Sequence, residues 1–524
     1  MAALRFLILP VLVIFGMTLQ GASCAKILIH PWTTGFNSRL LNMQKMADIL
    51  AEDGHDVTVL LSDKVRKYNI LKKATALEYT TPESAFVLAD IDFVEYPKLT
   101  LWNYDESVKG FFSFTLDYCK SILSDKKIMD YLDKKNFDLL IVEMFDECNR
   151  VLVSHFNVPA ISYQNHGYLS YASLMYPQMY GMTCISFGMD NCHKDDMTFM
   201  EKFKNMVMVY KFNRLIPEGR KRYEDLAKEH NIKLHEDINL AFEKNLVLLN
   251  ADHVLHEPWP RMPNVFMISG LFNKPPSPLP KDIEQLVRDS APHGFVVMSF
   301  GTLVSSFKKE TAEIFAKVFA KLPQRVFMRY KGELTNKGNN TILSDWLPQA
   351  DLLSHPLAKA FVTHCGISAT FESSYIGVPV VTVPLFAEQV YNSHKLTKRR
   401  GMGVQVDFSS LDETTFMNAL TEVIHNPQYK ANAVETSKLL RANPIPPKQQ
   451  FLQLIDYTIK TGGAKHLIHD VGIHLTWYEK LGLDVALISL GAFFAAISMA
   501  SLSLYCVVKV VCNKVSKTSK QKTS

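Results

Sequence analysis

The stretch Phe361–Gln389, FVTHCGISATFESSYIGVPVVTVPLFAEQ, decides the fold because two short apolar runs flank a segment with a helical pattern. The runs FVT and VPVVTVP are typical of buried parallel strands. A strand, a helix and a second strand in this order form the repeating unit of a doubly wound α/β domain. The sequence therefore predicts that His364 and Gly366 follow the carboxyl end of a strand, which is where ligands bind in open sheets of this kind.

The same alternation of strands and helices continues on both sides of this stretch. The first half contains the apolar runs AKILIH, GHDVTVL, FDLLIV and VPAISY, and the second half contains GFVVMSFG and RVFMRY. The proline-rich segment NKPPSPLP lies between them. A chain of 524 residues is also long enough for two domains. We predict an α/β protein of two facing doubly wound Rossmann-like domains, residues 26–272 and 286–470, joined by a linker at 273–285.

Apolar segments lie near both ends of the chain. Residues 1–25 carry one arginine, an apolar run and small residues, which is typical of a secretory signal peptide; a buried strand is the alternative. Residues 485–508 are uncharged and, as a helix about 36 Å long, could cross a bilayer; a core helix is the alternative. We expect a juxtamembrane segment at 471–484 and, because residues 509–524 are basic, a cytoplasmic tail there. These features predict a single-pass type I membrane protein.

Two short motifs bear on the compartment. Lys522 and Lys520 lie three and five residues from the C-terminus, a spacing that resembles the dilysine retrieval signal of endoplasmic reticulum membrane proteins. The alternative is a solvated basic tail beside anionic lipid. The sequon Asn339-Asn340-Thr341 predicts N-glycosylation at Asn339. We therefore expect a protein of the endoplasmic reticulum membrane whose two domains face the lumen.

Composition and cysteine spacing argue against several classes of site. The formal net charge is only +5, five lysines lie in the last sixteen residues, and no basic patch is interleaved with aromatic residues, so we expect no nucleic-acid partner. No GxGxxG follows the first strand, which disfavours a nicotinamide-dependent dehydrogenase. The cysteines between signal and anchor have no spacing typical of metal ligands, and because their number is odd, at least one is free or paired between chains. They are Cys119, Cys148, Cys184, Cys192 and Cys365.

Polar side chains of the second half fit a bound phosphate and a ribose. A helix that begins near Ser368 presents unpaired backbone N–H groups and a positive dipole to an anion, and His364 and Gly366 stand beside it. Thr302, which follows MSFG, adds a hydroxyl from a neighbouring strand end. Glu372 lies one turn into the same helix, where a carboxylate can accept hydrogen bonds from vicinal hydroxyls.

Further polar and aromatic residues extend this set at both ends. Trp346 offers a flat face to a base, and Gln349 can bind the polar edge of that base. Glu388 and Gln389 supply acceptors and an amide donor that suit a sugar. Each residue alone could equally be a helix cap, a core residue or a surface residue. In order, however, the set provides a base platform, a phosphate site, a ribose acceptor and sugar acceptors.

The segment from Trp346 to Gln389 resembles the donor-binding signature of UDP-glycosyltransferases, with WLPQ, HP, THCG, a glutamate, GVPVVTVP and LFAEQ in matching order. GFVVMSFGT, NPQYKANA and LTWYEKLGLDV resemble the membrane-bound animal UDP-glucuronosyltransferases, and the similarity covers essentially the whole chain. The resemblance implies a GT-B fold and UDP-sugar as co-substrate, with no cofactor and no metal. It also implies donor contacts to uracil from Trp346 and Gln349, to the diphosphate from His364 and Thr302, to ribose from Glu372, and to the sugar from Glu388 and Gln389.

Two departures from the family pattern fall within the donor signature. Ala369 stands where Ser, Thr or Gly is usual, and Glu388 stands where Asp is common. The first change removes one possible polar contact, and the second moves the carboxylate by about one methylene group. Neither change abolishes the predicted donor site.

A larger departure affects the catalytic base. The family uses a histidine at the start of the first-domain helix, oriented by an aspartate after a later strand. Matching back from ADILAEDGHDVTVL places Arg39 at the histidine position and Glu143 at the aspartate position. Because an arginine stays protonated, it cannot act as a general base. We hypothesise that an Arg39–Glu143 ion pair replaces the usual dyad.

Three interpretations of this replacement stay open at the level of sequence. Glu143 could be the base for acidic acceptors such as phenols, His30 at the end of the first strand could be an alternative base or a structural histidine, or the protein could bind UDP-sugar without turnover. Segments rich in aromatic residues and methionine, such as SYASLMYPQMYGMTCISFGM, suit small lipophilic acceptors. The resemblance therefore implies an inverting transferase that moves a hexose or glucuronate to phenols, alcohols or amines. The donor sugar and any homo- or hetero-oligomer are not determined by these residues.

Overall fold

The conformation of the protein comes from a computed structural model. It describes residues 24–33, 37–82, 104–144, 146–165, 198–234, 245–256, 261–273, 275–301, 308–385, 388–468, 475–480 and 482–521. Several sequence predictions fall outside these ranges: most of the signal peptide, the proposed phosphate contact Thr302, Lys522 of the dilysine motif, and the cysteines Cys184 and Cys192.

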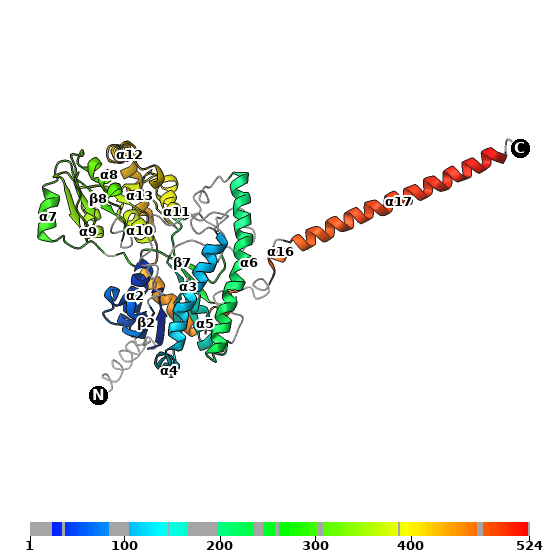
Figure 1. Ribbon diagram of the computed structural model, residues 1–524, viewed down its shortest axis with the longest axis horizontal. Coiled ribbons are helices and arrows are strands. Elements are labelled where there is room, and N and C mark those ends of the chain that lie inside the picture. The colour runs from blue at the N-terminus through cyan, green and yellow to red at the C-terminus, as the bar shows by residue number, and fades with distance from the viewer. Residues whose placement is uncertain are drawn as a thin grey trace, which may run out of the picture.

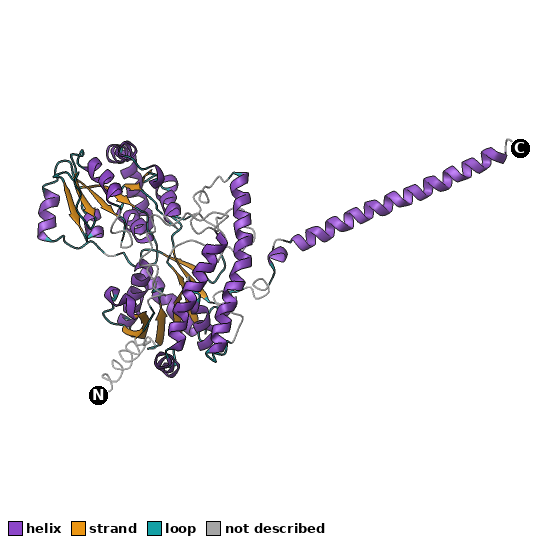
Figure 2. Ribbon diagram, viewed as in Figure 1, coloured by secondary structure: helices purple, strands orange, loops and turns teal. Residues whose placement is uncertain are grey.

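Two α/β bodies and one long projecting helix make up the molecule (Figure 1). The first body contains the blue and cyan elements together with the green helix α6, the second contains the elements from α7 to α13, in green to yellow, and helix α17 extends away from both. In each body the strands are enclosed by helices (Figure 2). This arrangement confirms the prediction of two doubly wound halves followed by an apolar helix.

The first body is built on a seven-stranded sheet of order β3-β2-β1-β4-β5-β6-β7, in which every pairing is parallel. The strand order reverses between β1 and β4, which is the switch point where such sheets bind ligands. β4 and β5 are buried along their whole length, as expected for apolar strands covered on both faces. The strands are β1 (Lys26–His30), β2 (Asp56–Ser62), β3 (Thr75–Tyr79), β4 (Leu139–Glu143), β5 (Ala160–Gln164), β6 (Leu246–Asn250) and β7 (Val265–Ile268).

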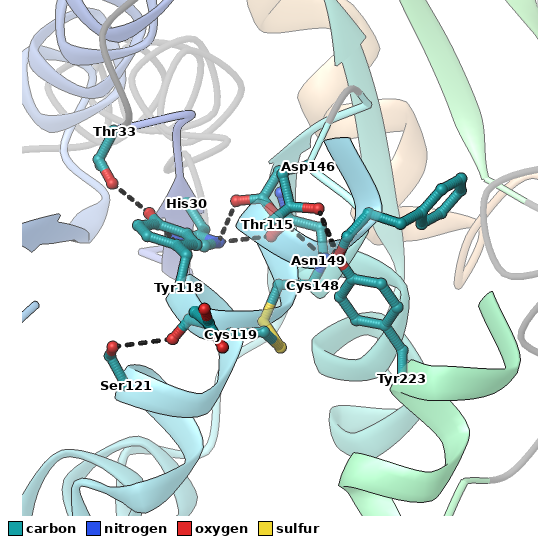
Figure 3. Close-up of a disulfide and its surroundings, with 12 residues drawn as sticks. His30, Thr33, Thr115, Tyr118, Cys119, Ser121, Asp146, Cys148, Asn149 and Tyr223 are labelled. Carbon is teal, nitrogen blue, oxygen red and sulfur yellow. Dashed lines mark hydrogen bonds and ion pairs between the residues drawn. A yellow bond between two sulfur atoms is a disulfide. The ribbon is translucent and has the colours of Figure 1, made fainter. Parts of the chain in front are cut away.

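Helices lie between most of these strands along the chain. They are α2 (Asn37–Glu52), the 3-10 helix η1 (Asp63–Tyr68), α3 (Tyr104–Ser124), α4 (Lys126–Lys135), α5 (Cys148–Phe156) and α6 (Phe199–Glu229). A disulfide between Cys119 and Cys148 joins α3 to the first residue of α5 (Figure 3). The sequence left this pairing open. Among the described cysteines between the predicted signal and the predicted anchor, Cys365 is the remaining one, and it is a buried free thiol.

The second body is built on a six-stranded parallel sheet of order β10-β9-β8-β11-β12-β13, which reverses between β8 and β11. Its strands are β8 (Phe295–Ser299), β9 (Arg325–Arg329), β10 (Thr341–Ser344), β11 (Ala358–Thr363), β12 (Val380–Thr382) and β13 (Gly403–Gln405). Its helices are α7 (Lys281–Arg288), α8 (Lys309–Phe319), α9 (Gln349–Ser354), α10 (Ile367–Ile376), α11 (Gln389–His394), the π-helix η6 (Lys395–Arg399), the 3-10 helix η7 (Phe408–Ser410), α12 (Glu413–His425) and α13 (Pro427–Arg441).

The chain then returns to the first body through α14 (Pro447–Lys460). Phe451, Leu454 and Ile455 recur at helical spacing and lie in the same apolar cluster as Ile27 and Val59 of the first sheet. In Figure 1, α14 is the orange helix that lies among the blue elements near α2 and β2. From sequence order we expected the trailing helices to belong to the second domain; the apolar face of α14 corrects this, because it covers the first sheet.

The C-terminal part contains the 3-10 helix η8 (Lys465–Leu467), α16 (Trp477–Lys480) and α17 (Leu483–Gln521). Within α17, residues Leu483–Asn513 form a 31-residue apolar stretch. Its most apolar 18 residues have a mean hydropathy of 2.1 and are not buried inside the protein. Its length and composition suffice to cross a membrane. Its exposure distinguishes it from a core helix and agrees with the span predicted at 485–508.

Candidate active site

The turn between β11 and α10 carries the predicted phosphate ligands. Gly366 precedes α10, which begins at Ile367, one residue before the position expected from the sequence. A Cβ atom on Gly366 would lie 2.6 Å from Nε2 of His364, and one on Gly301 would lie 3.0 Å from Cε1 of the same ring. Both glycines therefore leave room for the imidazole beside the helix N-terminus. Ser368 is exposed in the first turn of α10.

His364 is suited to bind a ligand rather than to take a proton. Burial lowers its pKa to about 4, so the imidazole is neutral near pH 7. The ring stacks on Phe300 with the centroids 6.0 Å apart. Among the described residues, its buried Nδ1 atom has no hydrogen-bond partner. A phosphate oxygen at the helix N-terminus would supply that partner.

Gln349 and Glu372 lie on two different helices and are in direct contact, and Trp346 lies in the loop before the first of these helices. Nε2 of Gln349 donates to Oε2 of Glu372 over 2.6 Å. Burial raises the pKa of Glu372, and the hydrogen bond from Gln349 opposes this increase. The Trp346 side chain is 65% exposed and therefore presents its ring to solvent. An exposed aromatic face thus precedes by three residues an amide that binds a carboxylate, as a base and its ribose would require.

The loop after β12 carries the last two predicted donor residues. Glu388 is half-buried and immediately precedes α11. Gln389 is buried, and its side-chain oxygen accepts a hydrogen bond from the backbone N–H of Leu385 over 2.9 Å. Nδ2 of Asn392, one turn later, donates to the backbone carbonyl of Cys365 over 3.0 Å. The proposed sugar loop and the proposed phosphate turn are therefore joined directly.

At the carboxyl end of the first sheet, Arg39 of α2 forms an ion pair with Glu143 at the end of β4. The pair is almost completely buried, with side-chain exposures of 7% and 0%. This confirms the ion pair hypothesised from the sequence, while the catalytic roles of both residues stay predictions. A buried pair of opposite charges whose polar atoms are satisfied is a strong local constraint on both side chains.

Neutral polar residues surround this ion pair and were not singled out in the sequence. Asn42 donates to Oδ1 of Asn165 over 2.7 Å, and the Tyr163 hydroxyl donates to the same oxygen over 2.9 Å. Asn250 donates to the Asn165 backbone carbonyl over 3.2 Å. The signal available in the sequence was weak: Asn165 and Asn250 each lie at or just after the end of an apolar strand.

His30, the alternative base, lies in a closed polar network (Figure 3). Its Nδ1 lies 2.6 Å from Oδ1 of Asn149 and its Nε2 lies 3.2 Å from the Tyr118 hydroxyl. The residue is fully buried, and burial lowers its pKa to about 4. Asp146 lies 3.9 Å from Nδ1, and burial raises the pKa of this carboxyl well above its usual range. With both ring nitrogens engaged, His30 holds β1, α3 and α5 together, and the geometry gives no support to its use as a base.

The predicted glycosylation site lies on the surface, and the prediction about metal ligands can be compared with the described residues. Asn339 is exposed in the turn before β10, which is compatible with a glycan, whereas Thr341 of the same sequon is buried at the start of the strand. Within the described ranges, no group of three or more His, Cys, Asp or Glu side chains could hold a metal ion.

The chain matches a family model described as "UDP-glucoronosyl and UDP-glucosyl transferase" over residues 25–521. It is 32% identical to UDP-glucuronosyltransferase 2B33 of Macaca mulatta over 489 residues, which cover 89% of this chain and 90% of that protein. It is also 32% identical to UDP-glucuronosyltransferase 2B7 of Homo sapiens over 496 residues, with the same coverage of each chain.

Solved glycosyltransferase structures share the fold. The glycosyltransferase of kitacinnamycin superposes with a TM-score of 0.58 at 16% identity, covering 83% of this chain and 99% of that one. Glycosyltransferase VinC, in complex with DTDP, gives a TM-score of 0.58 at 16% identity and covers 83% and 100%. These likenesses confirm the predicted two-domain GT-B architecture.

Proposed function

The chain belongs to the family of UDP-glucuronosyl and UDP-glucosyl transferases, and from this premise we propose that it moves a hexose or glucuronate from UDP-sugar to small lipophilic acceptors. It is a UDP-glycosyltransferase with UDP-sugar as its co-substrate. The proposal extends this to the acceptor class, to the residues that act, and to a location at the luminal face of the endoplasmic reticulum membrane. The apolar helix α17 and the lysine-rich tail support that location.

The observation that carries the donor assignment is the direct contact between Gln349 and Glu372, 2.6 Å apart, beside an exposed Trp346. In the proposal, the indole stacks on uracil and the glutamate accepts hydrogen bonds from the ribose hydroxyls. His364 and the N-terminus of α10 bind the diphosphate. Glu388 and Gln389, which begin the next helix, bind the sugar hydroxyls.

The proposed reaction combines the donor residues of the second body with the Arg39–Glu143 pair of the first body. The acceptor oxygen attacks the anomeric carbon, the bond from that carbon to the UDP oxygen breaks, and UDP leaves with the bonding electrons. A base must take the acceptor proton. Glu143 is the carboxylate beside the position of the usual base, and Arg39 holds it through the ion pair. An ion-paired carboxylate suits acceptors that lose a proton easily, such as phenols, better than it suits aliphatic alcohols.

One cation near the proposed base platform bears on the identity of the donor sugar. Arg329, at the end of β9, donates from Nε to the backbone carbonyl of Asp345 over 3.0 Å. This contact involves the residue before Trp346, so Arg329 supports the loop that carries the proposed base platform. Its placement leaves UDP-glucose and UDP-glucuronate as equal candidates for assay.

A second candidate function is donor binding with little or no turnover. The buried Arg39–Glu143 pair favours it, because the residue at the usual base position is a cation. The two candidates make opposite predictions for acceptor-dependent release of UDP.

The experiment is an assay of UDP release by the full-length protein in detergent micelles. UDP-glucuronate and UDP-glucose are each supplied with a panel of phenols, alcohols and amines. We expect turnover with one donor and the acidic phenols above all. UDP-sugar binding without transfer to any acceptor of the panel would contradict the proposed function and favour the second candidate.

A further inference from the structure

A short turn of the first body reaches the phosphate turn of the second. Residues 251–256, here named the docking turn, follow β6 and are held in shape by Asp252. The backbone N–H of His256 donates to the Asp252 carbonyl over 2.8 Å, and that of Val254 donates to the Asp252 carboxylate over 2.7 Å. Ser269 donates to the same carboxylate over 2.5 Å. The docking turn is therefore preorganised by contacts within its own body.

The docking turn inserts an apolar side chain beside the phosphate-binding helix. Leu255 is completely buried and clusters with Ile367 and Phe371 of α10 and with Leu440 of α13. Ile367 is the first residue of α10, so Leu255 lies against the helix turn whose N–H groups face the predicted diphosphate. First-body residues thus contribute to the packing of the donor site.

The next residue makes a polar contact across the same boundary. Nε2 of His256 lies 2.6 Å from Nζ of Lys395, and both side chains are buried. Nδ1 of His256 lies 3.0 Å from the Asp252 carbonyl. With the proton on Nδ1 donated to that carbonyl, Nε2 accepts a hydrogen bond from Lys395. Tyr391 encloses the contact, with its ring centroid 4.0 Å from the same Nζ atom.

Lys395 is connected to the phosphate turn through Asn392. Its Nζ donates to Oδ1 of Asn392 over 3.0 Å, and Nδ2 of Asn392 donates to the Cys365 carbonyl over 3.0 Å. Cys365 has a φ angle of +61°, a left-handed conformation that is unfavourable for a residue other than glycine. Because Cys365 lies between His364 and Gly366, its conformation sets the direction of both predicted phosphate ligands.

We propose that His256, Lys395 and Asn392 form a positioning series through which the first body holds the left-handed phosphate turn at Cys365, and that His256 and Lys395 are therefore positioning residues for UDP-sugar binding. The proposal rests on the donor site of the proposed function. Burial lowers the pKa of both His256 and Lys395, in agreement with an uncharged contact inside the boundary.

The test measures UDP binding by calorimetry on the full-length protein in detergent micelles. His256→Phe and Lys395→Met each break the series at one point, and the double variant replaces both polar partners by apolar groups. The double variant removes both ends of the His256–Lys395 hydrogen bond, so it leaves only Oδ1 of Asn392 without its donor, whereas Lys395→Met alone also leaves Nε2 of His256 without one. We therefore expect the double variant to remain folded even where a single variant does not. Lys398→Met, an exposed lysine of the same π-helix, is the matched control.

We expect each single variant to weaken UDP binding about 10-fold and the double variant to weaken it about 10-fold as well, because the two residues act through one path. In turnover, KM for UDP-sugar rises while kcat changes less than about 3-fold, and the control matches wild type. Unchanged UDP binding, a multiplied loss of about 100-fold in the double variant, or failure of the double variant to fold would overturn the inference. Absence of UDP binding by wild type would instead overturn the donor site itself, and the inference with it.

Discussion

The carboxyl ends of the two sheets differ in whether their polar atoms are engaged within the protein. In the second sheet, His364 keeps a buried nitrogen without a partner among the described residues, and Trp346 keeps an exposed ring. In the first sheet, Arg39 and Glu143 engage each other, and His30 has partners at both nitrogens. The second sheet is thus prepared for a ligand and the first is closed by an ion pair. In the proposed function, donor binding and proton removal therefore depend on separate parts of the chain.

The comparison is tested most strongly by Arg39→Met, which leaves the Glu143 carboxylate buried without its guanidinium. We expect a loss of about 3–5 kcal/mol in the free energy of unfolding, since a buried charge then lacks its counter-charge. Arg66→Met is the matched control, because the Arg66 side chain of the Arg66–Glu78 pair is exposed to solvent, so its loss should cost much less. Unfolding in denaturant measures the free energy of unfolding of both variants. Equal losses in the two variants would contradict a buried, stabilising Arg39–Glu143 ion pair at the end of the first sheet.

Glu372→Gln tests the second half-site with a smaller effect. The substitution keeps a hydrogen bond to Gln349 but removes the charge that strengthens the bonds to ribose hydroxyls, so we expect KM for UDP-sugar to rise about 10- to 100-fold. The free energy of unfolding should change little. Glu310→Gln, at an exposed position of α8, should leave KM unchanged. A similar KM for Glu372→Gln and wild type would remove the ribose assignment.

Asp146→Asn tests the closed network of the first body through the pH dependence of its stability. Burial raises the pKa of Asp146 above its unfolded value, so this carboxyl destabilises the wild-type fold at neutral pH and the penalty disappears as pH falls through the folded-state pKa. The variant should therefore be more stable than wild type at pH 7.5, and this advantage should shrink as the pH falls to 5. Thermal unfolding at both pH values measures the difference. An advantage that grows on acidification would contradict the assigned sign.

Trp346→Ala has the smallest expected effect. Stacking of a base on an aromatic ring contributes about 1–3 kcal/mol, and the 65% exposure of this ring places it near the lower limit. We expect UDP to bind about 5- to 10-fold more weakly, with Trp346→Phe close to wild type and thermal stability unchanged. Calorimetric titration with UDP decides this, and equal affinities of wild type and Trp346→Ala would exclude the ring as the base platform.

The sequence predicted the elements whose signals are local. The apolar runs before His364 and after Gly377 indicated both strands around the donor turn, and the match of Arg39 and Glu143 to a known dyad indicated their ion pair. Contacts between segments that are far apart in the sequence were not predictable in this way. The packing of α14 on the first sheet, the pairing of Cys119 with Cys148 and the contact of His256 with Lys395 join positions with no periodic or motif relation.

The central claim, that the Arg39–Glu143 pair limits proton removal while donor binding is intact, is tested most directly by acceptor-dependent UDP release from wild type and Arg39→His. The rate is measured with a series of phenols and alcohols of increasing pKa. We predict that the wild-type rate falls steeply as the acceptor pKa rises, and that Arg39→His, which restores a general base, recovers about 100-fold or more for the least acidic acceptors. The same dependence on acceptor pKa in both proteins, with equal UDP affinity, would contradict the claim.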